Sequence, residues 1–334
     1  MTNPPNHIGD ARFQAAHACL AAGVPLVLLL VVRAEGSTPG RPGFKMVVPE
    51  EGETVGTIGG GIMEFRLREQ ALRMLADREQ APRLIKQVHH KKAPLAEQSG
   101  MICAGSQWQI LWPVYPDQAP LFQRIIDHHA RQEAVWLNLS AHQAPRLSPV
   151  EADADPFHFE QSGDSFVWRE RLGVVDTVVV IGSGHVGLAV CRTLQTLNDL
   201  RVVAVDHRDD VATFRDNAFA DEKHHLPMAR VGALVPDGSH IYVVIVTTGF
   251  DHDAEALYQV IDKNIAYLGL MGSKAKIAEI KRRLLERGVT SSAFDKVAMP
   301  IGLPIGAETP AEIAVSITAQ IIARRRSFNR EGAI

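Results

Sequence analysis

The second half of the chain alternates short apolar segments with segments of helical periodicity, and this alternation restricts the fold more than any other feature. Strands without polar positions, separated by helices, predict a parallel sheet that is covered on both faces. We therefore predict an α/β fold, with a doubly wound, Rossmann-like domain over residues 173–330. The expected strands are Val178–Ile181, Val202–Val205, Tyr242–Val246 and Ile265–Leu268, and the expected helices are His185–Leu197, Asp253–Asp262, Ser273–Arg287 and Pro310–Arg326.

A glycine-rich loop follows the first of these strands and fits the G-x-G-x-x-G pattern of dinucleotide-binding folds. In that pattern Gly182 makes the turn, Gly184 admits the pyrophosphate, and Gly187 lets the helix pack closely on the strand. Asp206 ends the next strand, where a carboxylate can accept the ribose hydroxyls of NAD, whereas Arg208 could instead meet the 2′-phosphate of NADP. A glycine turn that binds no ligand is the alternative interpretation.

Two further loops in this half contain residues of interest. Gly272, Ser273 and Lys274 lie where the fourth expected strand gives way to a helix. A lysine in the first turn opposes the helix dipole, so either an anionic ligand or an exposed basic face accounts for it. Thr309 and Glu312 are spaced as a capping box at the start of the last expected helix.

The first half reads as a mixed α+β domain that extends to residue 172. Residues 116–171 are less regular, and we interpret them as the tail of this domain running into a linker. The segment contains an expected helix at Leu121–Arg131, a strand at Ala134–Leu139 and a loop at Ala144–Pro156. Before it, the expected helices are residues 9–22 and Ile62–Asp77, and the expected strands are Val24–Val32, Phe44–Val48, Arg83–His89 and Gln107–Leu111.

The first half also contains a glycine-rich loop, the first along the chain, which ends in three successive glycines, Gly59, Gly60 and Gly61, just before a helix. Backbone N–H groups at such a helix start can hold a phosphate, which predicts a second anion site. A tight turn where two backbones pack closely is the alternative. Glu64 lies in the first helical turn, as a functional carboxylate or as compensation for the helix dipole.

Composition excludes several classes of protein. A net charge of −3 gives no broad basic field, so we expect no nucleic-acid partner. The chain has three cysteines without C-x-x-C spacing, which argues against a disulfide framework or a structural zinc site and favours the cytoplasm. Pro25–Val32 is too short to cross a bilayer, and we expect no signal peptide and no membrane partner. Adjacent histidines diverge on a helix or a strand, so we expect no metal site.

The chain resembles the xanthine dehydrogenase accessory protein family, XdhC/CoxI, over nearly its whole length. The matching segments are RAEGSTP at 33–39, GFKM at 43–46, GTIGGG at 56–61 followed by Glu64, GSGHVG at 182–187, GLMGS at 269–273 and PIGLPIGAETPAEIAVSI at 300–317. The resemblance implies an N-terminal XdhC-type domain and a C-terminal Rossmann domain. It also implies that the protein holds the molybdenum cofactor and helps its sulfuration and its insertion into a molybdenum hydroxylase of the xanthine dehydrogenase type.

The resemblance further implies a cysteine desulfurase as sulfur donor, and we expect a homodimer. Cys103 is the candidate for binding molybdenum or carrying a persulfide, because Cys19 and Cys191 fall on helix faces, although an inert buried thiol is the alternative. The sequence departs from the family pattern at Ala104 and at Pro304. The family usually carries a histidine directly after the third Rossmann strand, whereas His252 of this chain comes further along.

Two other functions stay open on the sequence alone. One is an NAD(P)-dependent oxidoreductase, for which His185 and His252 are the acid/base candidates. The other is a scaffold that docks a sulfur donor onto an apo-enzyme.

Overall fold

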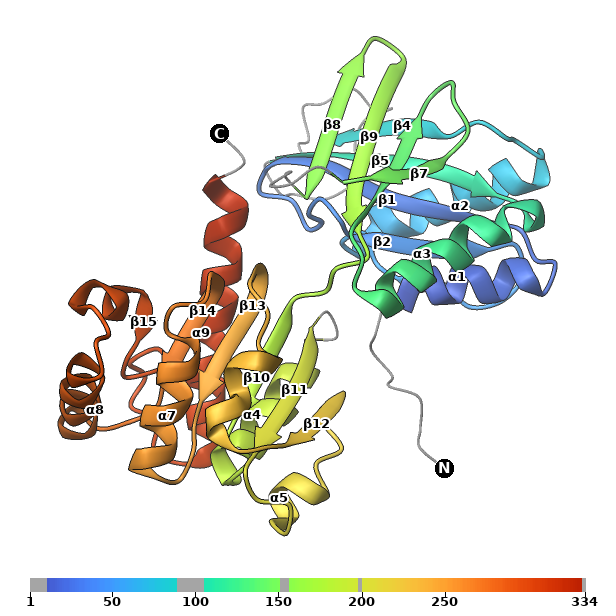
Figure 1. Cartoon of the computed structure of the whole chain (residues 1–334). Coiled ribbons are helices and arrows are strands. Elements are labelled where there is room, and N and C mark those ends of the chain that lie inside the picture. The colour runs from blue at the N-terminus through green and yellow to red at the C-terminus, as the bar shows by residue number, and fades with distance from the viewer. Residues whose placement is uncertain (1–10, 89–104, 151–155, 198–199, 332–334) are drawn as a thin grey trace. The chain divides into compact units, whose positions relative to one another are not determined.

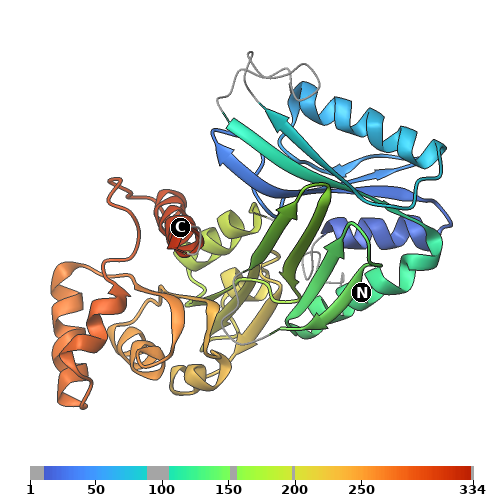
Figure 2. The ribbon, with the colours of Figure 1, turned by 90° about the horizontal axis from the view of Figure 1, so that it is seen from above.

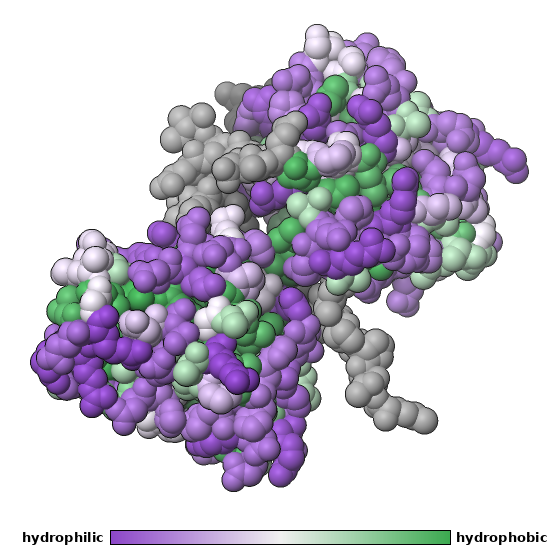
Figure 3. All heavy atoms as spheres, viewed as in Figure 1, coloured by the Kyte–Doolittle hydropathy of each residue, from purple (hydrophilic) through white to green (hydrophobic). Residues whose placement is uncertain are grey.

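The structure of the chain is a computed structural model that describes residues 11–88, 105–150, 156–197 and 200–331. The described residues form two compact units, one within Gly9–Val174 and the other beginning at Val175. Hydrophilic residues dominate the face of the molecule shown in Figure 3, with smaller apolar areas between them. In the part of the chain that is described, no helix combines the length and the apolar character needed to cross a membrane.

The unit that begins at Val175 is built on a parallel sheet of six strands in the order β12-β11-β10-β13-β14-β15 (Figure 1). The strands are β10 (Thr177–Ile181), β11 (Arg201–Asp206), β12 (Glu222–His225), β13 (Gly238–Ile245), β14 (Ile265–Leu270) and β15 (Val297–Ala298). Between and after them lie α4 (His185–Gln195), α5 (Ala212–Arg215), η2 (Met228–Arg230), α6 (Val231–Leu234), α7 (Phe250–Val260), α8 (Lys274–Glu286), η3 (Ser291–Lys296) and α9 (Pro310–Glu331).

Alternate side chains of the central strands enter two separate cores, one on each face of this sheet. Val178 and Val180 of β10 pack with apolar residues of α4 and α9. Val179 and Ile181 of the same strand pack with apolar residues of α7 and α8. A strand that is buried on both faces must be apolar at every position, which is why the sequence pattern was so regular. The doubly wound fold is confirmed.

The unit within Gly9–Val174 contains an antiparallel sheet of five strands in the order β3-β2-β1-β5-β4. Helix α2 covers one face of this sheet, and α1 and α3 lie on the other face (Figure 2). The strands are β1 (Leu26–Gly36), β2 (Lys45–Pro49), β3 (Val55–Gly56), β4 (Arg83–Val88) and β5 (Gly105–Val114), and the helices are α1 (Ala11–Ala21), α2 (Gly61–Ala76), η1 (Pro116–Gln118) and α3 (Ala119–Arg131).

A second antiparallel sheet, in the order β7-β6-β9-β8, corrects our interpretation of residues 144–171 as a loop and a linker. Its strands are β6 (Val135–Ser140), β7 (Arg146–Pro149), β8 (Phe157–Ser162) and β9 (Ser165–Leu172). The two sheets share one core, because Leu137 and Trp168 pack in the same cluster as Leu28 and Phe122.

A buried ion pair also joins the two sheets. Lys45 Nζ of β2 lies 2.6 Å from Glu170 Oε1 of β9, and both side chains are almost fully buried. The ammonium group also lies over the ring of Phe13, 5.5 Å from its centroid. Lys45 belongs to one of the segments that resemble the XdhC/CoxI pattern. Here its side chain is buried in an ion pair that joins the two sheets.

Candidate functional site

The first glycine loop has an unusual backbone, which explains its sequence. Gly59, Gly60 and Gly61 all adopt positive φ values, of 128°, 75° and 72°. A Cβ atom at Gly59 would lie only 2.8 Å from Gly40 N and from Pro39 Cβ, so this glycine serves close packing. A Cβ at Gly60 would meet no atom within 4 Å, so the backbone there is open to a ligand.

Glu64 binds the glycine loop that precedes it. Its Oε2 atom accepts hydrogen bonds from the N–H groups of Ile58 and Gly60, each at 3.0 Å, and from the hydroxyl of Thr57 at 2.6 Å. The carboxylate therefore acts as an internal anion that binds the donors of this loop. The sequence predicted Glu64 in the first helical turn but not these three partners. The four-residue spacing between Gly60 and Glu64 was the signal that could have indicated the contact.

The first glycine loop is held by a buried glutamine of the neighbouring strand β5. Gln107 is fully buried; its Oε1 accepts from the N–H of Gly40 at 3.0 Å, and its Nε2 donates to the carbonyl of Ile58 at 2.9 Å. One side chain thus joins the loop before β2 to the loop before α2. This fixes the loop geometry independently of any ligand.

Two large apolar side chains are exposed in the first turns of α2, next to the open glycine. Ile62 and Phe65 are 55% and 62% exposed. The first N–H groups of α2 have no partner within the helix, because a helix start leaves them unpaired. This end of α2 therefore offers N–H donors beside an apolar surface.

The second glycine loop has two glycines that pack and one that is open. A Cβ at Gly182 would lie 2.6 Å from Thr247 N, and one at Gly187 would lie 1.9 Å from the carbonyl oxygen of Gly182. At Gly184 the nearest atom would be Thr248 Cγ2 at 3.6 Å, an ordinary contact. A ligand can therefore approach the loop at Gly184, the last residue before α4.

Asp206 is fully buried at the end of β11, and protein donors occupy both of its oxygens. Oδ2 accepts from Ser183 N–H at 2.7 Å and from Arg208 Nη2 at 3.1 Å. Oδ1 accepts from Arg208 N–H and Arg208 Nε, each at 3.0 Å. Burial alone would raise the pKa of Asp206, but the hydrogen bonds from Arg208 and Ser183 outweigh it and hold the pKa below its usual range. In this arrangement Asp206 has no acceptor left for ribose hydroxyls.

Two histidines meet at the same end of the sheet. The rings of His207, which follows β11, and His252, in the first turn of α7, have centroids 3.9 Å apart. His185 is exposed at the start of α4. The structure therefore pairs His252 with a residue that sequence reasoning missed, although its position directly after Asp206 was visible.

The loop before α8 is explained by contacts within the protein. Ser273 caps the helix, its hydroxyl accepting from the N–H of Lys276 at 3.3 Å. Lys276 forms an ion pair with Asp253, which is fully buried and accepts from Thr247 N–H at 3.1 Å. Burial raises the pKa of Asp253 in spite of the lysine. Gly272 precedes this cap, and Lys274 is exposed, so a role for either in holding an anion stays a prediction.

Comparison with known proteins agrees with this architecture. Residues 178–321 match the XdhC Rossmann domain, and residues 19–87 match the XdhC and CoxI family. The chain belongs to the XdhC/CoxI family.

Two known proteins are similar to this XdhC/CoxI chain over most of its length. The protein named "Uncharacterized protein YqeB" from Escherichia coli (strain K12) is 28% identical over 306 residues, which cover 89% of this chain but 43% of that protein. The chain therefore spans less than half the length of this relative. A crystal structure described as a xanthine dehydrogenase (BH1974) from Bacillus halodurans has the same fold, with a TM-score of 0.75 and 24% identity. That likeness covers 95% of this chain and 96% of the other.

Cys103 is the candidate for the sulfur chemistry that the family resemblance implies. Cys103 lies outside the described residues. Burial raises the pKa of Cys191 to about 11 and also raises the pKa of Cys19, so neither thiol ionises readily near neutral pH. Within the described segments, no three His, Cys, Asp or Glu residues are grouped so that they could hold a metal ion.

Proposed function

We propose that this chain is an accessory protein that binds the molybdenum cofactor of a xanthine dehydrogenase-type hydroxylase and assists its sulfuration and insertion. The observation that carries the proposal is the open backbone at Gly60, at the start of α2, within the unit that contains the XdhC/CoxI match. Family membership supplies the class of client. A cysteine desulfurase as sulfur donor and a homodimeric assembly belong to the same proposal.

The residues around Gly60 fit a pterin that carries a phosphate. A phosphate at the start of α2 would accept hydrogen bonds from the first N–H groups of the helix, while Glu64 keeps those of Ile58 and Gly60. The exposed side chains of Ile62 and Phe65 offer an apolar surface for the flat ring system. When bound, the cofactor supplies the molybdenum centre, whose terminal ligand is the group that sulfuration replaces.

The second glycine loop forms the other half of the proposal. It would hold the phosphates of a nucleotide, either a nucleotide part of the cofactor or NAD(P), at the start of α4. An NAD(P)-dependent oxidoreductase is the second candidate function, and the doubly wound sheet with an open Gly184 favours it. The filled carboxylate of Asp206 weighs against ordinary NAD recognition through the ribose.

The small-molecule content of freshly purified protein tests the proposal against the oxidoreductase. Mass spectrometry and absorbance spectroscopy should detect a molybdopterin that leaves the protein on denaturation. NAD(H) as the only bound molecule, together with turnover of a hydroxy or imino substrate, would favour the oxidoreductase instead.

A further inference from the structure

The His207–His252 pair, whose rings are tilted relative to each other, spans the carboxyl end of strand β10. In the sheet, β10 pairs with β11 on one side and with β13 on the other. His207 follows β11, and His252 lies in the helix that follows β13. Contact between the two rings, at 3.9 Å between centroids, therefore joins the two sides of the second glycine loop, which itself follows β10.

The charged groups around the pair do not supply a free anion. His207 Nδ1 lies 3.3 Å from Asp206 Oδ1, but the charge of that carboxylate is already balanced by Arg208. On the other side, Asp253 is paired with Lys276. His225 hydrogen-bonds to the carbonyl of His207 at 3.1 Å and faces Asp209, which is exposed.

This setting disfavours a positive charge on His207. Burial lowers the pKa of His207, and the neighbouring ring of His252 lowers it further. A new negative charge nearby would therefore favour protonation of His207.

The glycine loop contains an unused polar group at the same end of the sheet. Ser183 is 1% exposed, and its hydroxyl has no hydrogen-bond partner among the described residues. Its N–H donates to Asp206 and its carbonyl accepts from the hydroxyl of Thr213. A buried hydroxyl without a partner is costly, and a ligand atom at the loop would provide one.

We propose that the His207–His252 pair contributes positive charge to a diphosphate-bearing ligand at the second glycine loop, and that the pair takes up a proton when this ligand binds. The inference rests on the part of the proposed function that gives this loop a phosphate-bearing ligand. The anion favours the imidazolium form, so protonation and ligand binding strengthen each other by linkage. Ligand affinity therefore falls as the pH rises above the pKa of His207.

Calorimetric titration with NAD⁺ tests this inference, because the diphosphate of NAD⁺ does not titrate near neutral pH. We expect binding to weaken by up to about tenfold per pH unit between pH 6.5 and 8. Titrations in two buffers with different ionisation enthalpies should show uptake of up to about one proton per bound NAD⁺. Affinity that is independent of pH, binding without proton uptake, or no binding of NAD⁺ at any pH would each overturn the inference.

Two variants separate the pair from other histidines. His207→Gln should remove the proton uptake and flatten the pH dependence, whereas His224→Gln, at a histidine of the same unit that faces Glu222, should leave both unchanged. Proton uptake that persists in the His207→Gln protein would contradict the assignment. NMR titration of the histidine ring protons in the unmodified protein needs no variant: NAD⁺ should raise the pKa of His207, and an unchanged value would also overturn the inference.

These experiments are independent of molybdopterin binding at the first glycine loop. NAD⁺ binding with proton uptake, in a protein that fails to bind molybdopterin, would refute the proposed cofactor role and leave this inference intact. Molybdopterin binding without the proton linkage would do the reverse.

Discussion

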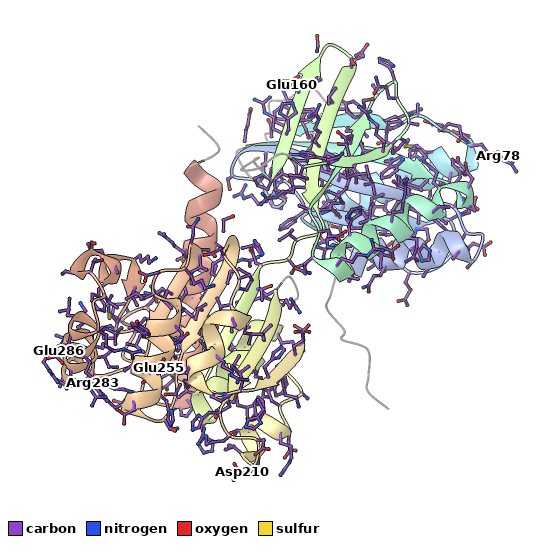
Figure 4. The ribbon with its side chains drawn as sticks, in the orientation of Figure 1. Arg78, Glu160, Asp210, Glu255, Arg283 and Glu286 are labelled. Carbon is purple, nitrogen blue, oxygen red and sulfur yellow. The ribbon has the colours of Figure 1, made fainter. Side chains whose placement is uncertain are left out.

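The Asp206 carboxylate accepts hydrogen bonds from Ser183 and Arg208 of the protein itself, so its replacement should lower the stability of the fold. Asp206→Asn removes the charge that balances Arg208 and turns one accepting oxygen into a donor. We expect the variant to lose about 2–4 kcal/mol of unfolding free energy at pH 7, measured by urea denaturation. Asp210→Asn, at an exposed residue that projects outward from the same loop (Figure 4), should change it by less than about 0.5 kcal/mol.

The pH dependence of that difference follows from the direction of the pKa shift. Because the folded state lowers the pKa of Asp206, its contribution is present above the unfolded pKa, about 3.9. The contribution is lost as the pH falls through the lower, folded value. The difference between the parent protein and Asp206→Asn should therefore shrink below about pH 4. A difference that stays constant down to acid unfolding would contradict this account of the residue.

Two glycines of the second loop should respond very differently to the same change. Gly187→Ala places a Cβ atom 1.9 Å from the carbonyl oxygen of Gly182, so helix α4 must move away from the loop. We expect a loss of about 3 kcal/mol or more, visible as a lower melting temperature. Gly184→Ala has room, at 3.6 Å from Thr248 Cγ2, and a negative φ of −71°, so it should stay within about 1 kcal/mol of the parent. Equal melting temperatures for the two variants would refute this packing argument.

At the scale of elements, one side chain of β5 fixes the loop that leads into α2. Gln107→Leu leaves the N–H of Gly40 and the carbonyl of Ile58 without their buried partner. We expect a loss of about 2–4 kcal/mol, measured by denaturant unfolding. Gln123→Leu removes a solvent-exposed hydrogen bond to Asp127 on α3 and should cost less than about 0.5 kcal/mol. Similar losses in both variants would mean that Gln107 does not hold the loops together.

The sequence predicts best those strands whose side chains are buried on both faces of the sheet. Strands β10, β11, β13 and β14 are apolar on both faces, and their alternation with helices predicted the parallel sheet correctly. Strand β9 was missed because Glu170 occupies an inward position in the alternation of Phe166, Trp168 and Leu172. Its partner Lys45 lies 125 residues earlier, and no local pattern reveals such a pair.

The candidate site likewise combines features that are local in the sequence with contacts between residues that are distant in it. The glycine loops and the capping box at Thr309 and Glu312 are local signals, and the structure has the capping box, with Thr309 N–H donating to Glu312 at 2.9 Å. The filled oxygens of Asp206 and the contact between His207 and His252 depend on how strands β11 and β13 flank β10. Such contacts follow from sheet order and not from spacing along the chain.

At the scale of the whole molecule, each unit contains one glycine loop with its own open glycine, so the two proposed ligand sites can be altered separately. Gly60→Asp should weaken molybdopterin binding by about tenfold or more, because a carboxylate there repels phosphate and takes the N–H groups itself. Gly60→Asn is the matched control, since Asn has nearly the same shape and also tolerates a positive φ, here 75°. If both variants bind molybdopterin as tightly as the parent, the loop is a packing turn only.

The proposed cofactor role depends on the equilibrium affinity of the purified protein for molybdopterin, which anaerobic dialysis measures. The account predicts saturable binding of one cofactor per chain, with a dissociation constant on the order of micromolar or below. It also predicts that Gly60→Asp weakens this binding while Gly60→Asn retains it. A folded protein that shows no saturable binding of molybdopterin, and that binds only NAD(H) and oxidises or reduces a substrate with it, would contradict the account.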